Sequence, residues 1–211
     1  MNSIFIDTST NHLILAYFHN DKLIDKIDRV VLKDMSSQLF PYLDELLNRN
    51  FFSIQDLHKI YVVVGPGSFT GVRIGVTVAK TIAWGLNIPI VPISSLEVLA
   101  STGGADYVCS YIDARRGYVF AGVYDKNLEP VISDSYLSID NLSDIIQEKI
   151  GESVQFVSYD SIDFFQTVLP KIHLEQVLSK HYDNDGLSPH LVNPVYLKLT
   201  EAEEKLLHEN C

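Results

Sequence analysis

The order of predicted elements indicates two mixed α/β lobes in this chain of 211 residues. Three strands, a helix, a fourth strand and a second helix occur in that order twice, with little sequence shared between the halves. Short polar turns predict antiparallel strands at the start of each half, and the helix before the fourth strand predicts a crossover. We expect a first lobe over residues 1–100, a second over residues 101–197, and a helix over about residues 198–211 that packs back on the first lobe.

Alternation of apolar and polar residues defines the elements of the first half. Strands are expected at residues 4–6, 12–18, 23–32, 59–64 and 88–91, and helices at residues 37–50, 53–56, 69–86 and from residue 94 onward. Leu39 and Leu43 lie at helical spacing in the first of these helices. Ser53 and Ser94 begin short helices with patterns that resemble capping boxes. The apolar middle of residues 59–64 predicts a central strand that is buried on both faces.

The second half repeats this order. Strands are expected at residues 107–112, 118–124, 131–137 and 154–158, and helices at residues 140–150 and 162–169. A hairpin tip with the sequence Asp-Ala-Arg-Arg-Gly joins the first two of these strands at residues 113–117. Thr200 and Glu203 form a capping box that opens a final helix to about residue 209. Residues 170–192 contain no motif that we can place.

Composition and charge restrict the classes of protein to which this chain can belong. Hydrophobic residues make up 46% of the chain and charged residues 20%, as is ordinary for a soluble globular protein. No apolar run approaches the ~18 residues that cross a membrane, and the N-terminus lacks a signal-peptide pattern, so we expect a cytoplasmic location. The net charge of −11 opposes a phosphate backbone. The chain is therefore not expected to bind RNA by itself, although binding through a basic partner remains open.

The segment from Gly65 to Gly75 lies between a predicted strand and a predicted helix, where helix N-termini commonly bind phosphate. A P-loop needs four residues between its glycines, followed by Lys and Ser or Thr, and this spacing is absent. A dinucleotide fingerprint needs Gly-x-Gly-x-x-Gly, whereas Gly65, Gly67 and Gly71 enclose one residue too many. We interpret the segment as a tight turn with Ser68 as N-cap, followed by a smooth stripe of small residues. An anion site at Gly67 and Ser68 is the alternative.

Two other polar clusters are candidates for chemistry. Asp7 and Thr8 follow the first strand, where an acidic residue in a two-lobed fold can hold a metal-bound phosphate. We favour a turn closed by side-chain hydrogen bonds, because no glycine is present there. Arg115 and Arg116 can clamp a carboxylate or phosphate, although such residues more often form local ion pairs. The seven histidines include no i,i+4 pair and the two cysteines lie far apart, so no metal site is expected.

Four motifs together carry a family resemblance. They are Gly-Pro-Gly-Ser-Phe-Thr-Gly-Val-Arg-Ile-Gly at residues 65–75, Ile-Asp-Thr-Ser at residues 6–9, Asp-Ala-Arg-Arg-Gly at residues 113–117 and Asn-Pro-Val-Tyr-Leu-Lys at residues 193–198. In this order they resemble the signatures of the TsaB family, historically described as glycoprotease-like, and they span nearly the whole chain. The first motif is highly specific, whereas each of the other three is weak by itself.

The resemblance implies a duplicated ribonuclease-H-like fold of the actin-like ATPase (ASKHA) class. It implies a non-catalytic accessory subunit that binds and activates a TsaD-like catalytic paralogue during formation of N6-threonylcarbamoyladenosine in tRNA. A TsaE-like ATPase is expected in the same assembly, and the resemblance implies that the chain can also pair with itself through the surface that binds the catalytic paralogue. The resemblance implies no intrinsic cofactor, with ATP or ADP and magnesium only in the assembled complex, and contact with tRNA only through the partner.

Carried onto this sequence, the partner interface falls on the helices at about residues 37–50 and 69–86. The residues assigned to it are Leu39, Leu43, Phe69, Gly71, Val72, Arg73, Gly75 and Val76. A vestigial nucleotide or anion site comprises Asp7, Thr8, Gly67 and Ser68, and a hairpin contact comprises Arg115 and Arg116. The sequence departs from the family pattern at Met35, where a histidine is usual, and at Lys198, where an arginine is usual.

An enzyme is the competing interpretation. A phosphotransferase or ATPase of the actin-like class would bind its nucleotide in the inter-lobe cleft, with Asp7 as the anchor of the metal ion. Tight binding of ATP and magnesium that is lost in Asp7→Ala would favour this interpretation. A peptidase has less support, because the sequence contains neither a Gly-x-Ser-x-Gly elbow nor a zinc-binding His-x-x-x-His pattern.

Overall fold

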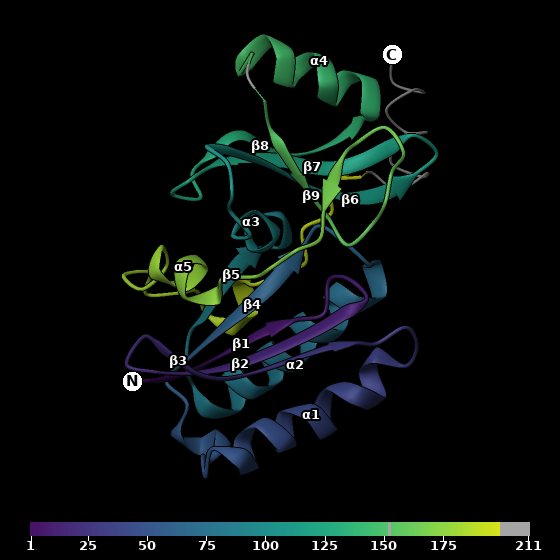
Figure 1. Ribbon diagram of the computed structural model, residues 1–211. Coiled ribbons are helices and arrows are strands. Elements are labelled where there is room, and N and C mark those ends of the chain that lie inside the picture. Colours follow the sequence, from purple (N-terminus) through teal and green to yellow (C-terminus); the bar gives the residue numbers. More distant parts are fainter. Residues whose placement is uncertain (152, 199–211) are drawn as a thin grey trace, which may run out of the picture.

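Each half of the chain forms one five-stranded mixed sheet, and the two sheets stack to make two lobes (Figure 1). The computed structural model describes residues 1–151 and 153–198. The predicted helix over about residues 198–211, including the capping box at Thr200, therefore lies outside the described residues except for Lys198. None of the helices that the structure describes combines the length and apolarity needed to cross a membrane.

The first sheet has the order β3-β2-β1-β4-β5. Its strands are β1 (Asn2–Asp7), β2 (His12–His19), β3 (Lys22–Val30), β4 (Lys59–Gly65) and β5 (Ile90–Ser94). β1 pairs antiparallel with β2 and parallel with β4. The turn between β2 and β3 has positive φ angles at Asn20 and Asp21, as a two-residue hairpin requires. The predicted order of elements in the first half is confirmed.

Two helices cover the outer face of the first sheet, α1 (Met35–Arg49) and α2 (Phe69–Leu86) (Figure 1). Their apolar stripes and one face of β1 and β4 form the first core, which includes the fully buried Ile4, Leu39, Val62 and Ala79. Burying a side chain of the size of Ile4, Leu39 or Val62 stabilises the fold by about 1.5–3 kcal/mol. Between the two helices in sequence lies a short 3-10 helix, Ile54–Asp56, with Ser53 as its N-cap residue. The Ser53 hydroxyl donates to the Gln55 side-chain oxygen and accepts no hydrogen bond from a backbone N–H of this helix. The predicted capping box at Ser53 is therefore wrong.

The second sheet repeats the topology of the first, with the order β10-β9-β6-β7-β8. Its strands are β6 (Tyr107–Arg115), β7 (Tyr118–Asp125), β8 (Pro130–Ser138), β9 (Gln155–Val157) and β10 (Thr167–Val168). The three longer strands are antiparallel, and β9 and β10 run parallel to β6. The helix α4 (Ile139–Lys149) covers one face and contributes Leu142 and Ile146 to a core with Val119 and Ala121.

A third core lies between the two sheets. It contains the short helix α3 (Ser95–Ala100), in which every residue is buried, and the helix α5 (Leu174–Ser179). Ser94 caps α3 by accepting hydrogen bonds from the backbone N–H groups of Leu96 and Glu97, as predicted. Because Phe5 from the first sheet and Tyr124 from the second pack into the same cluster, the two lobes share this core.

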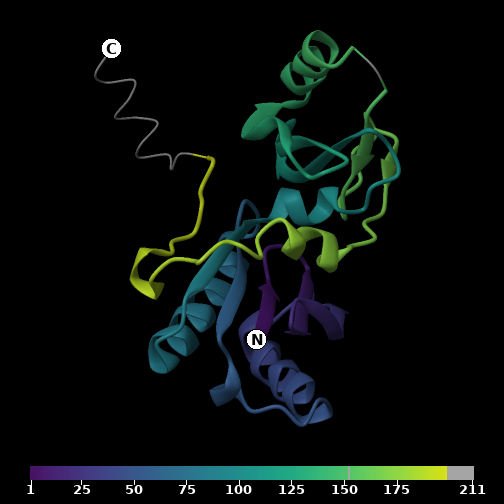
Figure 2. The same ribbon diagram turned by 90° about the vertical axis from the view of Figure 1, so that its left-hand side faces the viewer.

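The chain after α5 returns to the first lobe (Figure 2). Leu187 forms an antiparallel bridge with Ile90, and the Lys80 ammonium donates to the Val192 carbonyl at 2.7 Å. The Val195 N–H donates to the Val64 carbonyl at 2.8 Å, so this stretch lies beside β4. A lobe boundary near residue 100 stays a prediction.

Two elements of the second half differ from expectation. Residues 162–169 form a turn and the two-residue strand β10 instead of a helix, because Phe165 packs against Phe156 at 4.2 Å between ring centroids and Val168 pairs with β9. The sequence between residues 170 and 192 contains α5, which we did not predict. Its buried residues Leu174, Val177 and Leu178 have helical spacing that could have revealed it.

Candidate functional site: the inter-lobe cleft and the outer groove of the first lobe

The glycine-rich segment forms the predicted tight turn between β4 and α2. The Ser68 hydroxyl accepts a hydrogen bond from the Gly71 N–H at 3.2 Å, which confirms Ser68 as the N-cap of α2. The Ser68 N–H itself donates to the Ser9 carbonyl at 2.7 Å. One N–H group that an anion site would use is therefore already bonded within the fold.

The small residues of α2 pack inside the lobe. A Cβ at Gly71 would overlap the Thr8 carbonyl oxygen, and a Cβ at Gly75 would overlap the Thr8 hydroxyl. The Thr8 hydroxyl also donates to the Gly71 carbonyl at 2.7 Å, so the turn directly after β1 and the first turns of α2 are in direct contact. The glycine stripe thus brings α2 against β1.

Most residues of the predicted partner interface are buried, so their assignment to a partner surface is wrong. Leu39, Leu43, Val72 and Val76 are at most 2% exposed. Together with the buried Gly71 and Gly75 they form the lobe's own core and packing surface. Because these six residues are buried, they cannot contact a partner while the lobe is folded. The prediction was wrong for them because helical spacing identifies the face of α1 and α2 that points inward. Phe69 and Arg73 do lie on the surface.

The outward faces of α1 and α2 enclose an apolar groove of about 440 Å³, which we call the outer groove. Its lining residues are Ser36, Phe40, Phe69, Thr70, Arg73, Ile74, Thr77 and Val78. The Phe40 and Phe69 side chains are 54% and 56% exposed, and the Arg73 guanidinium lies 5.0 Å from the centre of the Phe69 ring. Our sequence reasoning missed Phe40, Ile74, Thr77 and Val78. The available sequence signal was Phe40, a large apolar residue that directly follows Leu39 and therefore lies off the apolar stripe of the helix.

Asp7 is closed off by the turn that follows β1. Its Oδ1 atom accepts hydrogen bonds from the Ser9 N–H at 2.8 Å and from the Ser9 hydroxyl at 2.7 Å, which confirms the predicted side-chain-bonded turn. Asp7 is 4% exposed. Burial raises the pKa of its carboxyl, and the hydrogen bonds from Ser9 lower it only in part. A carboxylate in this environment is poorly placed to hold a metal-bound nucleotide.

We expect Asp7→Asn to raise the free energy of unfolding at pH 7 by on the order of 1 kcal/mol. The amide oxygen can accept both bonds from Ser9 without the cost of burying a charge. Since the folded pKa of Asp7 is raised, folding favours its neutral form. The stability that this form contributes is fully present below the ordinary aspartate pKa of 3.8 and is lost as pH rises through the folded pKa. The advantage of the variant should therefore shrink as pH falls toward about 4.

Urea unfolding at a series of pH values measures this effect, and the exposed Asp44→Asn on α1 controls for removal of one negative charge. A variant at Asp7 that is less stable than the parent chain at pH 7 would show that the charged form is favoured by contacts beyond Ser9.

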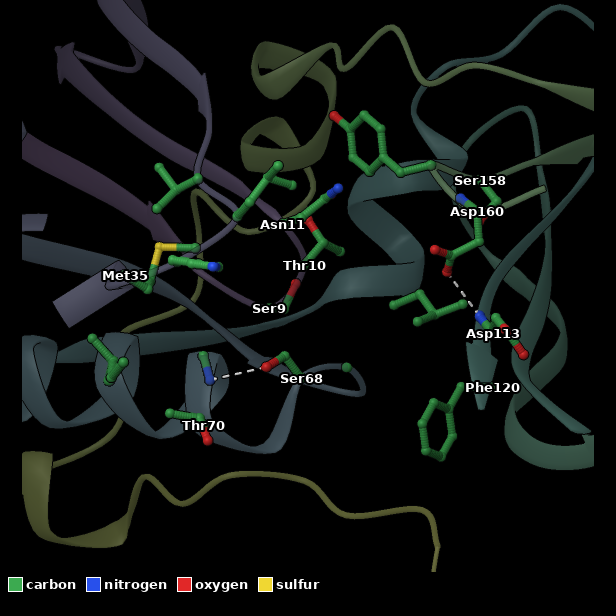
Figure 3. A pocket seen from close by; sticks show the side chains of 18 of the residues that line it. Ser9, Thr10, Asn11, Met35, Ser68, Thr70, Asp113, Phe120, Ser158 and Asp160 are labelled. Atoms are coloured by element: carbon green, nitrogen blue, oxygen red, sulfur yellow. Dashed lines mark hydrogen bonds between the residues drawn. The ribbon is translucent and has the colours of Figure 1, made fainter. Parts of the chain in front are cut away.

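The two lobes enclose a polar cleft of about 680 Å³ between the turn after β1 and the β6–β7 hairpin. Figure 3 shows Ser9, Thr10 and Ser68 on one side, with Asp113, Phe120 and Asp160 across from them. Gly67 and Ser68 line this cleft, so two of the four residues of the predicted anion site do face an open volume. The other two, Asp7 and Thr8, are buried. Met35 also lines the cleft.

Arg115 and Arg116 occupy the tip of the β6–β7 hairpin with φ angles of 67° and 59°. Both side chains are exposed, and Arg115 lines the cleft. The Asp113 carboxylate accepts from the Arg115 backbone N–H at 2.7 Å. In the part of the chain that the structure describes, neither guanidinium forms an ion pair, so the local pairing that we considered is wrong. Over residues 1–151 and 153–198, no three His, Cys, Asp or Glu side chains gather as a metal site would require.

Comparison with known proteins agrees with this architecture. The family model described as TsaD: tRNA N6-adenosine threonylcarbamoyltransferase matches residues 28–179. The chain is 36% identical to the tRNA threonylcarbamoyladenosine biosynthesis protein TsaB of Bacillus subtilis, over 97% of each chain. It is 30% identical to the Escherichia coli protein of the same name, over 60% of this chain and 56% of that protein.

Two solved structures from Pseudomonas aeruginosa share the fold. One is titled YeaZ and the other an uncharacterized protein with similarity to peptidase YEAZ, and their TM-scores are 0.75 and 0.80. Each is 24% identical and covers 93% of this chain, which covers 99% of each of them. The predicted duplicated ribonuclease-H-like fold of the actin-like class is thereby confirmed. The chain belongs to the TsaB (YeaZ) family.

Proposed function

We propose that the chain is a non-catalytic accessory subunit in the biosynthesis of N6-threonylcarbamoyladenosine in tRNA. In this role it binds and activates a TsaD-type catalytic subunit. Family membership supports the pathway, since relatives that carry the TsaB name are named for this biosynthesis. The observation that carries the binding role is the outer groove, where two half-exposed phenylalanines flank an apolar hollow on the first lobe.

The outer groove has the features of a protein-binding surface. Phe40 and Phe69 offer aromatic anchors and Arg73 a cation with several donors, which are residue types enriched at interfaces. The floor is formed by the partly buried Ile74 and the buried Val78, so a partner side chain entering the groove would meet apolar atoms. Because α1 and α2 are held by the core beneath them, their backbones need no ordering when a partner binds.

The same groove can accept a second copy of this chain. A self-paired form and a complex with the catalytic subunit would then compete for Phe40 and Phe69. The TsaE-type ATPase would join through another surface, and any ATP or ADP with magnesium would be bound in the assembled complex. The closed environment of Asp7 supports this assignment over a phosphotransferase, which needs an accessible anchor for its metal ion.

Reconstitution of tRNA modification tests the proposal. We expect modification with TsaD-type and TsaE-type partner proteins to fall to background when this chain is omitted and to return when it is added. The chain alone, with all substrates present, should give no modified tRNA. Modification that proceeds equally well without the chain would refute the proposal.

A further inference from the structure

The face of the second sheet that points away from α4 carries a cluster of aromatic side chains. Tyr118 and Phe120 alternate along β7, and Phe120 lies directly opposite Tyr136 on β8. The Tyr118 and Tyr136 rings stack at 4.9 Å between centroids with 14° between their planes, and the Phe120 ring lies 5.6 Å from Tyr136. We call Tyr118, Phe120 and Tyr136 the aromatic platform. Their neighbour Val119 points to the opposite face and is fully buried.

The aromatic platform is accessible at its outer end. Tyr118 is 41% exposed, and Phe120 and Tyr136 are partly exposed. Phe120 lines both the inter-lobe cleft and a smaller cavity of about 190 Å³ that is formed with the C-terminal stretch. Figure 3 shows the Phe120 ring at the edge of the cleft. The platform therefore packs through Phe120 against the core between the sheets at its inner end and opens into the cleft at its outer end.

Cations flank these rings in a chain that is acidic as a whole. Arg115 is the register partner of Tyr118 at the end of the β6–β7 ladder, next to a bulge, and its exposed side chain lines the inter-lobe cleft that Phe120 also lines. The Lys198 ammonium lies 5.4 Å from the centre of the Tyr136 ring. Within the described residues neither cation forms an ion pair. The nearby carboxylates of Asp113 and Asp160 accept from the backbone N–H groups of Arg115 and Asp113, respectively.

We propose that the aromatic platform, with Arg115 and Lys198, binds an unpaired segment of the RNA that the assembled complex modifies. Exposed rings stack on nucleobases that are free of a duplex, and flanking cations neutralise the phosphates between those bases. Bases inside a duplex are stacked on both faces by their neighbours, so they cannot stack on the outer face of the Tyr118 ring, whose inner face lies against Tyr136. This inference rests on the proposed function, because an acidic chain needs a partner to supply most of the phosphate contacts.

The test uses the reconstituted complex with two disruptive variants, Tyr118→Ala and Arg115→Asn, one conservative variant and two controls. Tyr118→Ala removes the most exposed ring, and we expect it to raise the KM for tRNA at least about fivefold with little change in kcat. Tyr118→Phe keeps the ring and should restore the KM. Arg115→Asn removes the guanidinium while suiting the positive φ angle, since Asn tolerates that conformation. Phe164→Ala and Arg29→Ala, which change an exposed aromatic residue and an exposed cation elsewhere, are the matched controls.

The salt dependence of RNA binding separates base stacking on Tyr118 from phosphate neutralisation by Arg115. Binding of a labelled anticodon stem-loop to the complex, measured by fluorescence anisotropy, should lose about 0.7 of its logarithmic salt slope in Arg115→Asn. Tyr118→Ala should weaken binding without changing that slope. A duplex of the same stem without its loop should bind equally to the parent complex and to Tyr118→Ala.

Three results would overturn the inference. They are an unchanged KM in both variants, equal loss of loop and duplex binding, and displacement of the stem-loop by polyglutamate as effectively as by unlabelled RNA. The last result would identify a surface for an acidic protein. If modification still requires the chain while the variants behave like the controls, only the platform assignment fails. If modification does not require the chain, the proposed function fails.

Discussion

Gly71→Ala is expected to lower the free energy of unfolding by about 3 kcal/mol, the upper end of what overpacking costs. The new Cβ would overlap the Thr8 carbonyl oxygen, which is a backbone atom of the residue directly after β1 and cannot rotate away. Relief requires α2 to move off the sheet, and that movement would break the hydrogen bond from the Thr8 hydroxyl to the Gly71 carbonyl. Urea unfolding followed by circular dichroism measures the change.

Gly85→Ala on the same helix is the matched control, and its expected effect has the opposite sign. Gly85 is exposed, and a Cβ there would meet no atom within 4 Å. Because alanine is the better helix former, we expect a gain of about 0.5–1 kcal/mol. If both substitutions changed stability in the same direction and by similar amounts, the contact between Gly71 and Thr8 would not be what positions α2.

Phe40→Asp is expected to weaken binding to a TsaD-type partner at least about thirtyfold, the effect of losing one interface hot spot. The change places a charge at the edge of the apolar outer groove. Since Phe40 is 54% exposed, the folded chain should lose little stability. Titration of the labelled chain with the partner protein measures the affinity, and thermal unfolding checks the fold.

Two kinds of control define the surface. Phe164→Asp replaces a phenylalanine of similar exposure, 61%, in the second lobe, and it should leave the affinity unchanged. Leu43→Glu and Val72→Glu should also abolish binding, but by unfolding the first lobe, because each places a carboxylate in its core. Retained affinity in a folded Phe40→Asp variant would exclude the outer groove as the partner surface.

Much of the fold could be predicted because its signals are local. The helix predicted at residues 69–86 coincides with α2, whose start is set by the Ser68 cap. The order of strands and helices in each half followed from alternation and turn residues, and it led directly to two mixed lobes. The expectation of a helix at residues 162–169 failed because Phe165 is held by tertiary stacking on Phe156, which local spacing does not encode.

The candidate site was predicted less well than the fold. Ser68, Gly67 and Arg115 do line the cleft, but six of the eight residues assigned to the partner surface are buried. Residues such as Phe40, on the outer face of α1, and Tyr136, opposite Phe120, gain their significance from neighbours that are distant in sequence. Helical periodicity identifies the apolar stripe of a helix, and we assigned that stripe to the partner surface. In a folded lobe, however, the apolar stripe of a helix faces the core of the lobe itself.

The sequence by itself determined the order of elements, the tight turn at Gly65 to Gly75 and the family resemblance, since each depends on residues adjacent in the chain. Only the tertiary structure decided which side of α2 faces solvent. Apolar residues occur around much of this helix, with Val72 and Val76 on one side and the partly buried Ile74 and buried Val78, which line the outer groove, on another, so spacing alone could not choose between them. The contacts of Gly71 and Gly75 with Thr8 make that choice, because only glycine lets the helix approach β1 so closely.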